Sequence, residues 1–347
     1  NAAARALAEA LAGVALAVGL HPHEFPRRGR EAETELPEDL ARDKVVALGE
    51  IGLDYHRFPD YPPPEPEAQR RAFAAQLRLA RLFELPVVVH VREAFDDALT
   101  LLREAGPLPA GGVLHCYAGG TARLEEALGL GFHLGVGGPL TYPKADDARE
   151  AAAAAPAGRL LLETDAPYLP PQGRRGERNE PAWLPEIGAA LARVRGEIVA
   201  DVAGYTTANA EALFRLAPAP TGSLVYAHGA NLYVNVTNRC SANCVFCPRR
   251  RGAFGFRGTE LGLTREPTRE EIIAAVGDPT RYHEIVLCGY GEPLLRWHVC
   301  LAVGRAVKAR GGRVRINTNG HADLLFGRDV LPERRDAVDA WSVSLNT

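Results

Sequence analysis

The chain has 347 residues, of which 46% are hydrophobic and 24% are charged, and its formal net charge is −3 at pH 7. This length exceeds what one hydrophobic core usually covers, so we expect two domains. The balanced composition excludes a disordered chain, no apolar run is long enough to cross a membrane, and the small negative charge gives no global sign of nucleic-acid binding.

Cysteine and methionine usage is unusual. Six cysteines occur, three of them close together, and methionine is absent. Clustered thiols suit a reducing, cytoplasmic compartment better than a disulfide framework. Because no initiator methionine is present, we expect the sequence to be a fragment, and the question of a targeting segment stays open.

Apolar, strand-like runs alternate with helix-like segments through the first part of the chain. Residues 1–11 have helical character, and a longer helix is expected over 65–83, with Phe73, Leu77 and Ala80 on one face. Continuous apolar runs favour parallel strands covered by helices on both faces, which predicts an α/β fold of the βα-barrel type. Six such runs are expected to be barrel strands: 14–20, 45–49, 86–90, 112–116, 132–137 and 159–165.

Metal-binding residue types recur along these runs. Glu50, His90, His115 and Asp165 each stand at or just past the carboxyl end of a different run. In a βα barrel those ends converge on the face that carries the active site. Two carboxylates and two imidazoles gathered there can hold divalent metal ions. A single histidine at such a position is more often a structural, hydrogen-bonded residue. Four residues of metal-binding types at the ends of four different runs are harder to explain by packing.

Six segments extend the pattern around these four residues: Gly19-Leu-His21-Pro22, Gly49-Glu50-Ile-Gly-Leu-Asp54, His90-Val-Arg92, His115-Cys-Tyr-Ala-Gly119, Glu163-Thr-Asp165-Ala-Pro167-Tyr-Leu169 and Arg178-Asn179-Glu180-Pro181. By these segments the sequence resembles, from about residue 14 to 214, the TatD family of metal-dependent hydrolases. By that resemblance Glu50 bridges two divalent ions (Mg, Mn or Zn), and Asp165 also orients or deprotonates the attacking water. His90 and His115 would serve one ion and Asp165 the other, while His21 and Arg92 would face the scissile phosphate of a DNA substrate.

The sequence departs from the TatD pattern at its start. The family opens with an Asp-x-His-x-His strand that supplies two ligands, and the present sequence begins downstream of that position. His21-Pro-His23 matches a later family element and does not replace it. We therefore expect a TIM-like barrel that lacks its first strand, with ligands for one ion and part of a second, and weak or absent hydrolysis by this fragment.

A change of composition separates the two expected domains. Ala217-Pro-Ala-Pro-Thr-Gly-Ser223 has the composition of a linker. We predict a hydrolase domain over 1–216, a linker over 217–230 and a second domain over 231–347. The basic loop 173–178 lies near the expected metal face, where it could contact phosphate, although charge alone favours a solvated loop.

Three cysteines follow a strand-like run at 231–237. Cys240, Cys244 and Cys247 are spaced by four and three residues, close enough to surround one compact cluster. A zinc site would need a fourth ligand nearby, but Cys288 lies in an apolar strand-like run and Cys300 in a helix-like run. Three thiolates on a four-iron cluster leave one iron without a protein ligand, and that open position is a place for chemistry.

This Cys-x3-Cys-x2-Cys segment resembles the signature of the radical S-adenosylmethionine (SAM) enzymes. By that resemblance Phe246 lies beside the adenine of SAM. The Gly289-Tyr-Gly291-Glu292-Pro293 segment would hold its amino group. Later strand ends, with Asn319, Ser344 and Asn346, would line its ribose and carboxylate. The implied partial βα barrel would be truncated at its carboxyl end, since the family usually has six strands and only four are expected here.

The resemblances together imply a bifunctional fusion. The first domain would be a DNase-like phosphodiester hydrolase. The second would use a [4Fe–4S] cluster, reduced by a flavodoxin or ferredoxin-type donor, to cleave SAM to a 5′-deoxyadenosyl radical. Two alternatives stay open: the first domain is a non-catalytic scaffold or partner-binding module, or it hydrolyses ester or amide bonds. No membrane association is expected.

Overall fold

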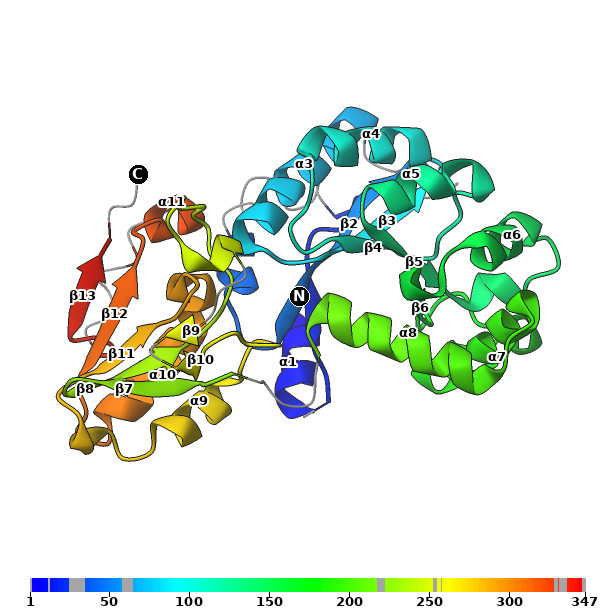
Figure 1. Ribbon diagram of the computed structural model, residues 1–347. Coiled ribbons are helices and arrows are strands. Elements are labelled where there is room, and N and C mark those ends of the chain that lie inside the picture. The colour runs from blue at the N-terminus through cyan, green and yellow to red at the C-terminus, as the bar shows by residue number, and fades with distance from the viewer. Residues whose placement is uncertain are drawn as a thin grey trace.

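The computed structural model describes residues 2–11, 13–24, 35–57, 65–216, 222–251, 255–256, 258–327, 330 and 336–344. Two α/β parts lie side by side (Figure 1). The part on the right of the view is built from the residues up to 216, and the part on the left from residues 222 onward. The amino terminus lies near the centre and the carboxyl terminus at the outer left.

The first part contains a parallel sheet of six strands among the described residues, in the order β1-β2-β3-β4-β5-β6. Neighbouring strands in space are also neighbours in the chain, as in the wall of a TIM-type barrel, so the predicted fold class is confirmed. The strand side chains are mostly buried, which explains their continuous apolar runs. The strands are β1 (Leu16–Val18), β2 (Val45–Asp54), β3 (Val87–Arg92), β4 (Gly112–Leu114), β5 (Phe132–Val136) and β6 (Leu160–Leu162).

Helices connect these strands and cover the sheet. In α3 (Pro66–Phe83) the predicted apolar face is buried and includes Phe73, Leu77 and Ala80. The helix ends at Phe83, and Glu84, with a left-handed φ of 48°, caps its last turn. Residues 35–40 are also helical, and further helices of this part are α1 (Ala2–Ala10), α4 (Phe95–Ala105), α5 (Leu124–Gly129), α6 (Asp146–Ala154), α7 (Leu184–Arg195) and α8 (Val199–Phe214), with short 3₁₀ turns η1 (Thr121–Arg123), η2 (Gly138–Thr141), η3 (Ala157–Arg159), η4 (Gln172–Arg174) and η5 (Pro181–Trp183).

The second part contains a five-stranded sheet in the order β13-β12-β11-β8-β7 among the described residues. Its central strands are parallel and follow each other in the chain, which gives the expected partial βα barrel. The strands are β7 (Val225–His228), β8 (Asn231–Asn235), β11 (Ile285–Cys288), β12 (Val314–Thr318) and β13 (Ala340–Val343), and a separate hairpin pairs β9 (Gly255–Phe256) with β10 (Thr259–Glu260).

One predicted segment differs from the structure. The expected linker 217–230 includes β7, which pairs antiparallel with β8 and covers its edge. Gly229, with a φ of 60°, allows the tight turn between the two strands. The run Val225–His228 is too short and too mixed to stand out in the sequence, so the strand was missed.

The helices that the structure describes in the second part are α9 (Arg269–Val276), α10 (Trp297–Lys308) and α11 (Ala322–Phe326), with 3₁₀ turns η6 (Pro248–Arg251), η7 (Pro279–Arg281) and η8 (Pro293–Arg296). The helix α9 begins with a capping box at Thr268. The Glu271 amide donates to Thr268 Oγ1 at 3.2 Å, and the Thr268 amide donates to Glu271 Oε2 at 2.8 Å.

The two parts share one hydrophobic core. A single cluster of buried side chains runs from the strands of the first sheet to those of the second. Phe83 at the end of α3 meets Phe326 of α11 edge to face, with 6.4 Å between ring centroids. This shared burial fixes how the two parts sit against each other. None of the described helices is both long enough and apolar enough to span a bilayer.

Candidate metal centre and cysteine loop

Glu50 lies inside β2 and not past its carboxyl end, which corrects that detail of the prediction. Gly49 pairs with Val88 of β3 and Ile51 with Val89, so Glu50 is an extra residue on β2 at a register shift. Such a β-bulge redirects a side chain locally. The bulge therefore explains how a residue in the middle of a long strand reaches the site.

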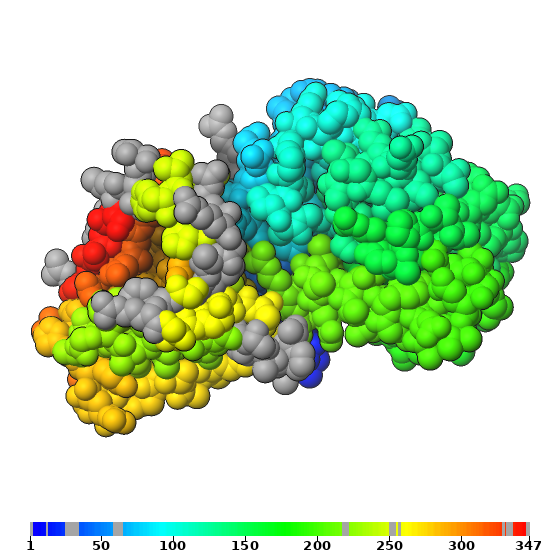
Figure 2. All heavy atoms as spheres, viewed as in Figure 1, coloured from blue at the N-terminus to red at the C-terminus, as the bar shows by residue number. Residues whose placement is uncertain are grey.

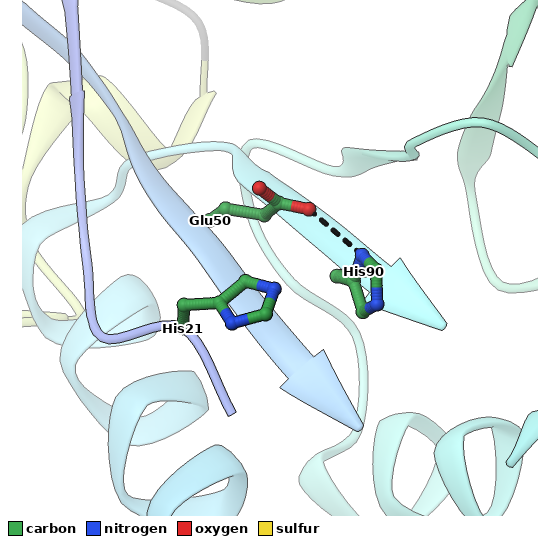
Figure 3. A group of neighbouring side chains, drawn as sticks. All are labelled: His21, Glu50 and His90. Atoms are coloured by element: carbon green, nitrogen blue, oxygen red, sulfur yellow. Dashed lines mark hydrogen bonds and ion pairs between the residues drawn. The ribbon is translucent and has the colours of Figure 1, made fainter. Parts of the chain in front are cut away.

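His21, Glu50 and His90 point toward one another (Figure 3). Their donor atoms all lie within 4.8 Å of one another. His90 Nδ1 is 2.9 Å from Glu50 Oε1, and the rings of His21 and His90 are 4.8 Å apart between centroids. These three side chains come from the segment after β1, from β2 and from β3, so the convergence expected of parallel strands is present.

His115 and Asp165 join the same site from the next strands. His115 follows β4, and its Nε2 lies 3.6 Å from Glu50 Oε1 and 3.6 Å from Asp165 Oδ1. The structure thus brings together all four of the residues that stood out in the sequence. A second group of donor atoms within 4.8 Å of one another consists of His115, Cys116 and Glu163.

Sequence reasoning missed several contributors. Asp54 is 3% exposed, and its Oδ2 lies 3.2 Å from His90 Nε2 and 2.9 Å from His23 Nε2. Glu163 Oε2 lies 2.9 Å from His115 Nδ1. A usable signal existed: Asp54 is four residues after Glu50 and Glu163 is two before Asp165, so both carboxylates stand in the same short segments as predicted site residues.

Burial and charge set the protonation of the site. Burial lowers the pKa of His21 to about 4, which leaves a neutral imidazole able to bind metal. For His90 and His115 burial also favours the neutral form, but hydrogen bonds to carboxylates outweigh it and raise each pKa to about 9. Burial raises the pKa of Asp165. For Glu50 burial is outweighed by His90 and His115, so its pKa is lowered.

This donor set fits divalent metal ions. Imidazole nitrogens and carboxylate oxygens are the ligands of zinc and manganese sites, and His90 and His115 are each held by a further carboxylate, as metal-binding histidines usually are. A cavity of about 570 Å³ opens beside the site and is lined by His90, Arg92, His115 and Asp165 together with apolar side chains. Arg92 ends β3 and is exposed at this cavity.

The three clustered cysteines lie on one loop after β8. Cys240, Cys244 and Cys247 are partly buried, and all six cysteines, which fall in the described part of the chain, are free. Asn319 Nδ2 lies 3.8 Å from Cys240 Sγ and 3.1 Å from Ser241 Oγ, so the end of β12 meets the loop. Three free thiols on one loop fit a cluster that takes three thiolates. Phe246 is 65% exposed.

The glycine-rich segment after β11 is packed against protein backbone. A side chain at Gly291 would meet the carbonyl oxygen of Arg239 at 2.2 Å, and one at Gly289 would meet Asn235 Oδ1 at 2.4 Å. The glycines therefore allow a close approach to the end of β8 and the residues before the cysteine loop. These contacts within the protein are a structural reason for glycine at both positions.

Glu292 connects two strand ends. It is 2% exposed, and its carboxylate accepts from Thr318 Oγ1 at 2.8 Å and from the Asn319 amide at 2.7 Å. Burial raises its pKa. Pro293 begins η8 directly after it.

Ser344 is exposed after β13, where its amide donates to Thr318 O at 2.8 Å, and Asn346 lies outside the described residues.

Comparison with known proteins decides the family. The model of TatD related DNases matches residues 1–215, more than half of the chain. The chain belongs to the TatD-related DNase family. A second model, that of the radical SAM superfamily, matches residues 234–347, so a TatD-type hydrolase domain and a radical SAM domain occur in one chain.

Several TatD relatives cover most of the first domain. The uncharacterized metal-dependent hydrolase YabD of Bacillus subtilis is 36% identical over 200 residues, which are 58% of this chain and 77% of YabD. The 3′-5′ ssDNA/RNA exonuclease TatD of Erwinia amylovora is 40% identical over 203 residues, 57% of this chain and 77% of that protein. The TatD-type domain thus shares extensive sequence with a nuclease.

Solved TatD structures share the fold. The TatD homologue YJJV from Escherichia coli K12 superposes with a TM-score of 0.58 at 36% identity, covering 62% of this chain and 82% of YJJV. A TatD family hydrolase from Entamoeba histolytica has a TM-score of 0.53 at 23% identity, with 61% and 79% covered, which shows the fold alone. Both agree with the barrel-type sheet described above.

Proposed function

We propose that the TatD-type domain hydrolyses phosphodiester bonds in DNA with divalent ions, Mg²⁺, Mn²⁺ or Zn²⁺. The observation that carries this proposal is the position of Glu50 Oε1, 2.9 Å from His90 Nδ1 and 3.6 Å from His115 Nε2. One carboxylate between two imidazoles suits a ligand shared by two ions. The exonuclease named among the relatives supports nucleic acid as the substrate class.

Each residue of the site has a proposed task. The family resemblance assigns His90 and His115 to one ion, Asp165 to the other and His21 to the phosphate. Because the donor atoms of His21 lie with those of Glu50 and His90, and His115 Nε2 lies 3.6 Å from Asp165 Oδ1, we propose instead that His21 and His90 bind on one side of Glu50 and that His115 and Asp165 bind on the other. Bound divalent ions would stabilise the charge that develops on the phosphate oxygens. The raised pKa of Asp165 brings its carboxylate closer to the basicity needed to accept a proton from the attacking water.

The cavity beside the site supports a nucleotide as the substrate. Its volume is about 570 Å³, and Val136, Leu140 and Leu169 give it apolar walls that suit a nucleobase. Arg92 lines the same cavity as His90, His115 and Asp165, and its guanidinium is proposed to bind the phosphate. A chain with a net negative charge offers no broad basic surface to nucleic acid, so the positive charge for the phosphate is local, at Arg92.

Cleavage of labelled single-stranded DNA tests the hydrolase proposal. Since the sequence predicts at most weak hydrolysis by this chain, we expect a low activity that EDTA abolishes and that Mg²⁺, Mn²⁺ or Zn²⁺ restores. We expect Asp165→Asn to reduce this rate about 10²–10⁴-fold, the usual contribution of a general base. Asp147→Asn, at an exposed position on α6, is the matched control and should retain full activity. Cleavage that persists in EDTA or in Asp165→Asn would exclude the proposed site. Absence of both metal binding and cleavage would favour a scaffold.

We further propose that the second domain holds a [4Fe–4S] cluster on Cys240, Cys244 and Cys247 and binds SAM. The cluster would supply the electron for reductive cleavage of SAM, after reduction by a flavodoxin or ferredoxin-type donor in the cytoplasm. The contact of Asn319 with Cys240 and Ser241 supports a ligand site between β12 and the loop.

We place the boundary between the domains after residue 216, with β7 in the second domain.

Iron analysis and absorbance test the cluster proposal. After anaerobic reconstitution of the whole chain, we expect brown [4Fe–4S] absorbance that Cys240→Ala abolishes because one of three ligands is gone. Cys300→Ala removes a thiol buried in α10, outside the loop, and should leave the iron content unchanged. A full cluster in Cys240→Ala would refute the ligand assignment.

A further inference from the structure

The end of α3 is bonded directly to the cysteine loop. Arg239, which is 2% exposed and precedes the first cysteine, donates from Nη1 to the carbonyl oxygen of Phe83 at 2.8 Å. Phe83 is the last residue of α3, where helix carbonyls have no partner within the helix and favour a cation. The TatD-type domain therefore anchors the backbone at the start of the loop.

Glu84 makes the next contacts. Its Oε2 accepts from the Cys240 amide at 3.3 Å, and its two oxygens lie 2.8 and 2.6 Å from Arg249 Nη1. Arg249 also donates to Asn238 O and to Ala242 O, each at 3.4 Å. One carboxylate of the TatD-type domain thus holds the start of the cysteine loop and the arginine that links its two ends.

Polar contacts hold this side of the loop. Glu84, Arg249 and Cys240 line a cavity of about 930 Å³ whose other walls are residues of α3 and α4, Pro109 and the loop residues 241–243. In Figure 2 the yellow-green atoms of the loop region lie on the side of the second domain that faces the blue and cyan atoms of the first. The side chains of Glu84 and Arg249 are only 16% and 18% exposed, so water screens their charges weakly.

We propose that Glu84 of the TatD-type domain positions the cysteine loop and helps set the reduction potential of the cluster. This inference rests on the cluster proposed above. Reduction adds one negative charge to a cluster, so a carboxylate beside Cys240 opposes reduction and the Arg249 guanidinium favours it. Because the two charges are paired, they offset each other, and removal of either one changes the potential.

Three variants of the whole chain, reconstituted anaerobically, test this role. Glu84→Gln leaves the charge of Arg249 without its partner and should shift the cluster's midpoint potential to more positive values. Arg249→Met should shift it to more negative values. The double variant removes both charges and should return the potential toward that of the wild type. Mediated redox titration followed by electron paramagnetic resonance gives the potentials, and iron analysis gives the occupancy.

Glu104→Gln is the matched control, because Glu104 lines the same cavity from α4. It should retain the wild-type potential and iron content. If Glu84→Gln and Arg249→Met hold the cluster at the wild-type potential, the proposal is wrong. If Glu84→Gln loses iron, recovery of iron in the double variant supports the role of the pair, and continued loss refutes it. A wild-type chain without a cluster would instead refute the cluster itself.

Discussion

At the scale of single residues, His90 is the most constrained group of the metal centre. Its two ring nitrogens meet different carboxylates, Glu50 at 2.9 Å and Asp54 at 3.2 Å. Asp54 is itself fixed, since its amide donates to Gln69 Oε1 at 2.7 Å and its Oδ1 accepts from the His56 amide at 2.9 Å. A carboxylate held in this way can orient the imidazole for metal binding without being a ligand.

Asp54→Asn tests this orienting role. We expect metal affinity to fall about 10–100-fold, the usual cost of losing such a partner, with nuclease activity recovering at saturating metal because the ligands remain. Calorimetric titration with Mn²⁺ or Zn²⁺ measures the affinity. Asp96→Asn, at an exposed pair with Arg123, is the control and should bind metal like the wild type. Unchanged affinity in Asp54→Asn would mean that His90 is oriented by other contacts.

At the scale of elements, the strand β2 contains both the bulge at Glu50 and, two residues later, Gly52, whose backbone conformation favours glycine. Gly52 has a φ of +136°, and a side chain there would approach the carbonyl oxygen of His90 to 2.0 Å. Gly52 pairs with His90 in the register of β2 and β3. The close approach of the two strands at this point therefore sets the distance between Glu50 and His90.

Gly52→Ala should separate the strands. We expect a loss of about 2–4 kcal/mol of unfolding free energy, from backbone strain and steric contact, together with loss of metal binding. Gly204→Ala makes the same change in α8, where nothing lies within 4 Å, and should stabilise the protein by about 0.5–1 kcal/mol. Urea unfolding compares the two. Equal stability of both variants would contradict the strand contact as the cause.

The elements also show what the sequence could predict. Apolar runs identified the six strands that the structure describes in the first sheet because most residues of these strands are buried or half-buried. Adjacency to those runs then placed His90, His115 and Asp165 together, since parallel strands end on one face. The bulge at Glu50 depends on how β2 pairs with β3, and no local pattern reports that pairing.

Contacts between segments that are distant in the chain could not be predicted from the sequence. Glu84 and Cys240 are 156 residues apart, and neither residue type nor spacing indicates that they meet. The same holds for His23, whose bond to Asp54 follows from the turn after β1. Family motifs named His21 and Arg92, but only the fold shows that His21 lies beside Glu50 and His90.

At the scale of the whole molecule, Glu266 organises the arginines that join the two domains. It lies 3.1 Å from Arg239 Nε and 3.2 Å from Arg296 Nε, and it accepts from Thr237 Oγ1 at 2.7 Å. Arg239 bonds to Phe83 O, and Arg296 Nη2 lies 3.2 Å from Asp43 Oδ1, so both arginines reach the TatD-type domain. The loss of this carboxylate would leave two buried cations without their shared partner.

The charge of Glu266 gives the domain contact a pH dependence. Burial opposes ionisation, but Arg239 and Arg296 outweigh it and lower the pKa of Glu266 below its ordinary value of 4.5. A lowered carboxyl pKa contributes stability that is fully present above 4.5 and is lost as the pH falls through the folded-state value. We therefore expect the wild type to lose this contribution only in acid.

Glu266→Gln separates this effect from general acid unfolding. At pH 7 we expect the variant to be less stable by about 3–5 kcal/mol, the usual cost of breaking a buried ion pair, with the difference from wild type narrowing below pH 4.5 as the wild-type carboxyl is protonated. Urea unfolding between pH 7 and acid pH measures both. Glu186→Gln, at an exposed pair with Arg174, should cost less than about 1 kcal/mol. A difference for Glu266→Gln that stays constant into acid would show that its charge does not hold the two domains together.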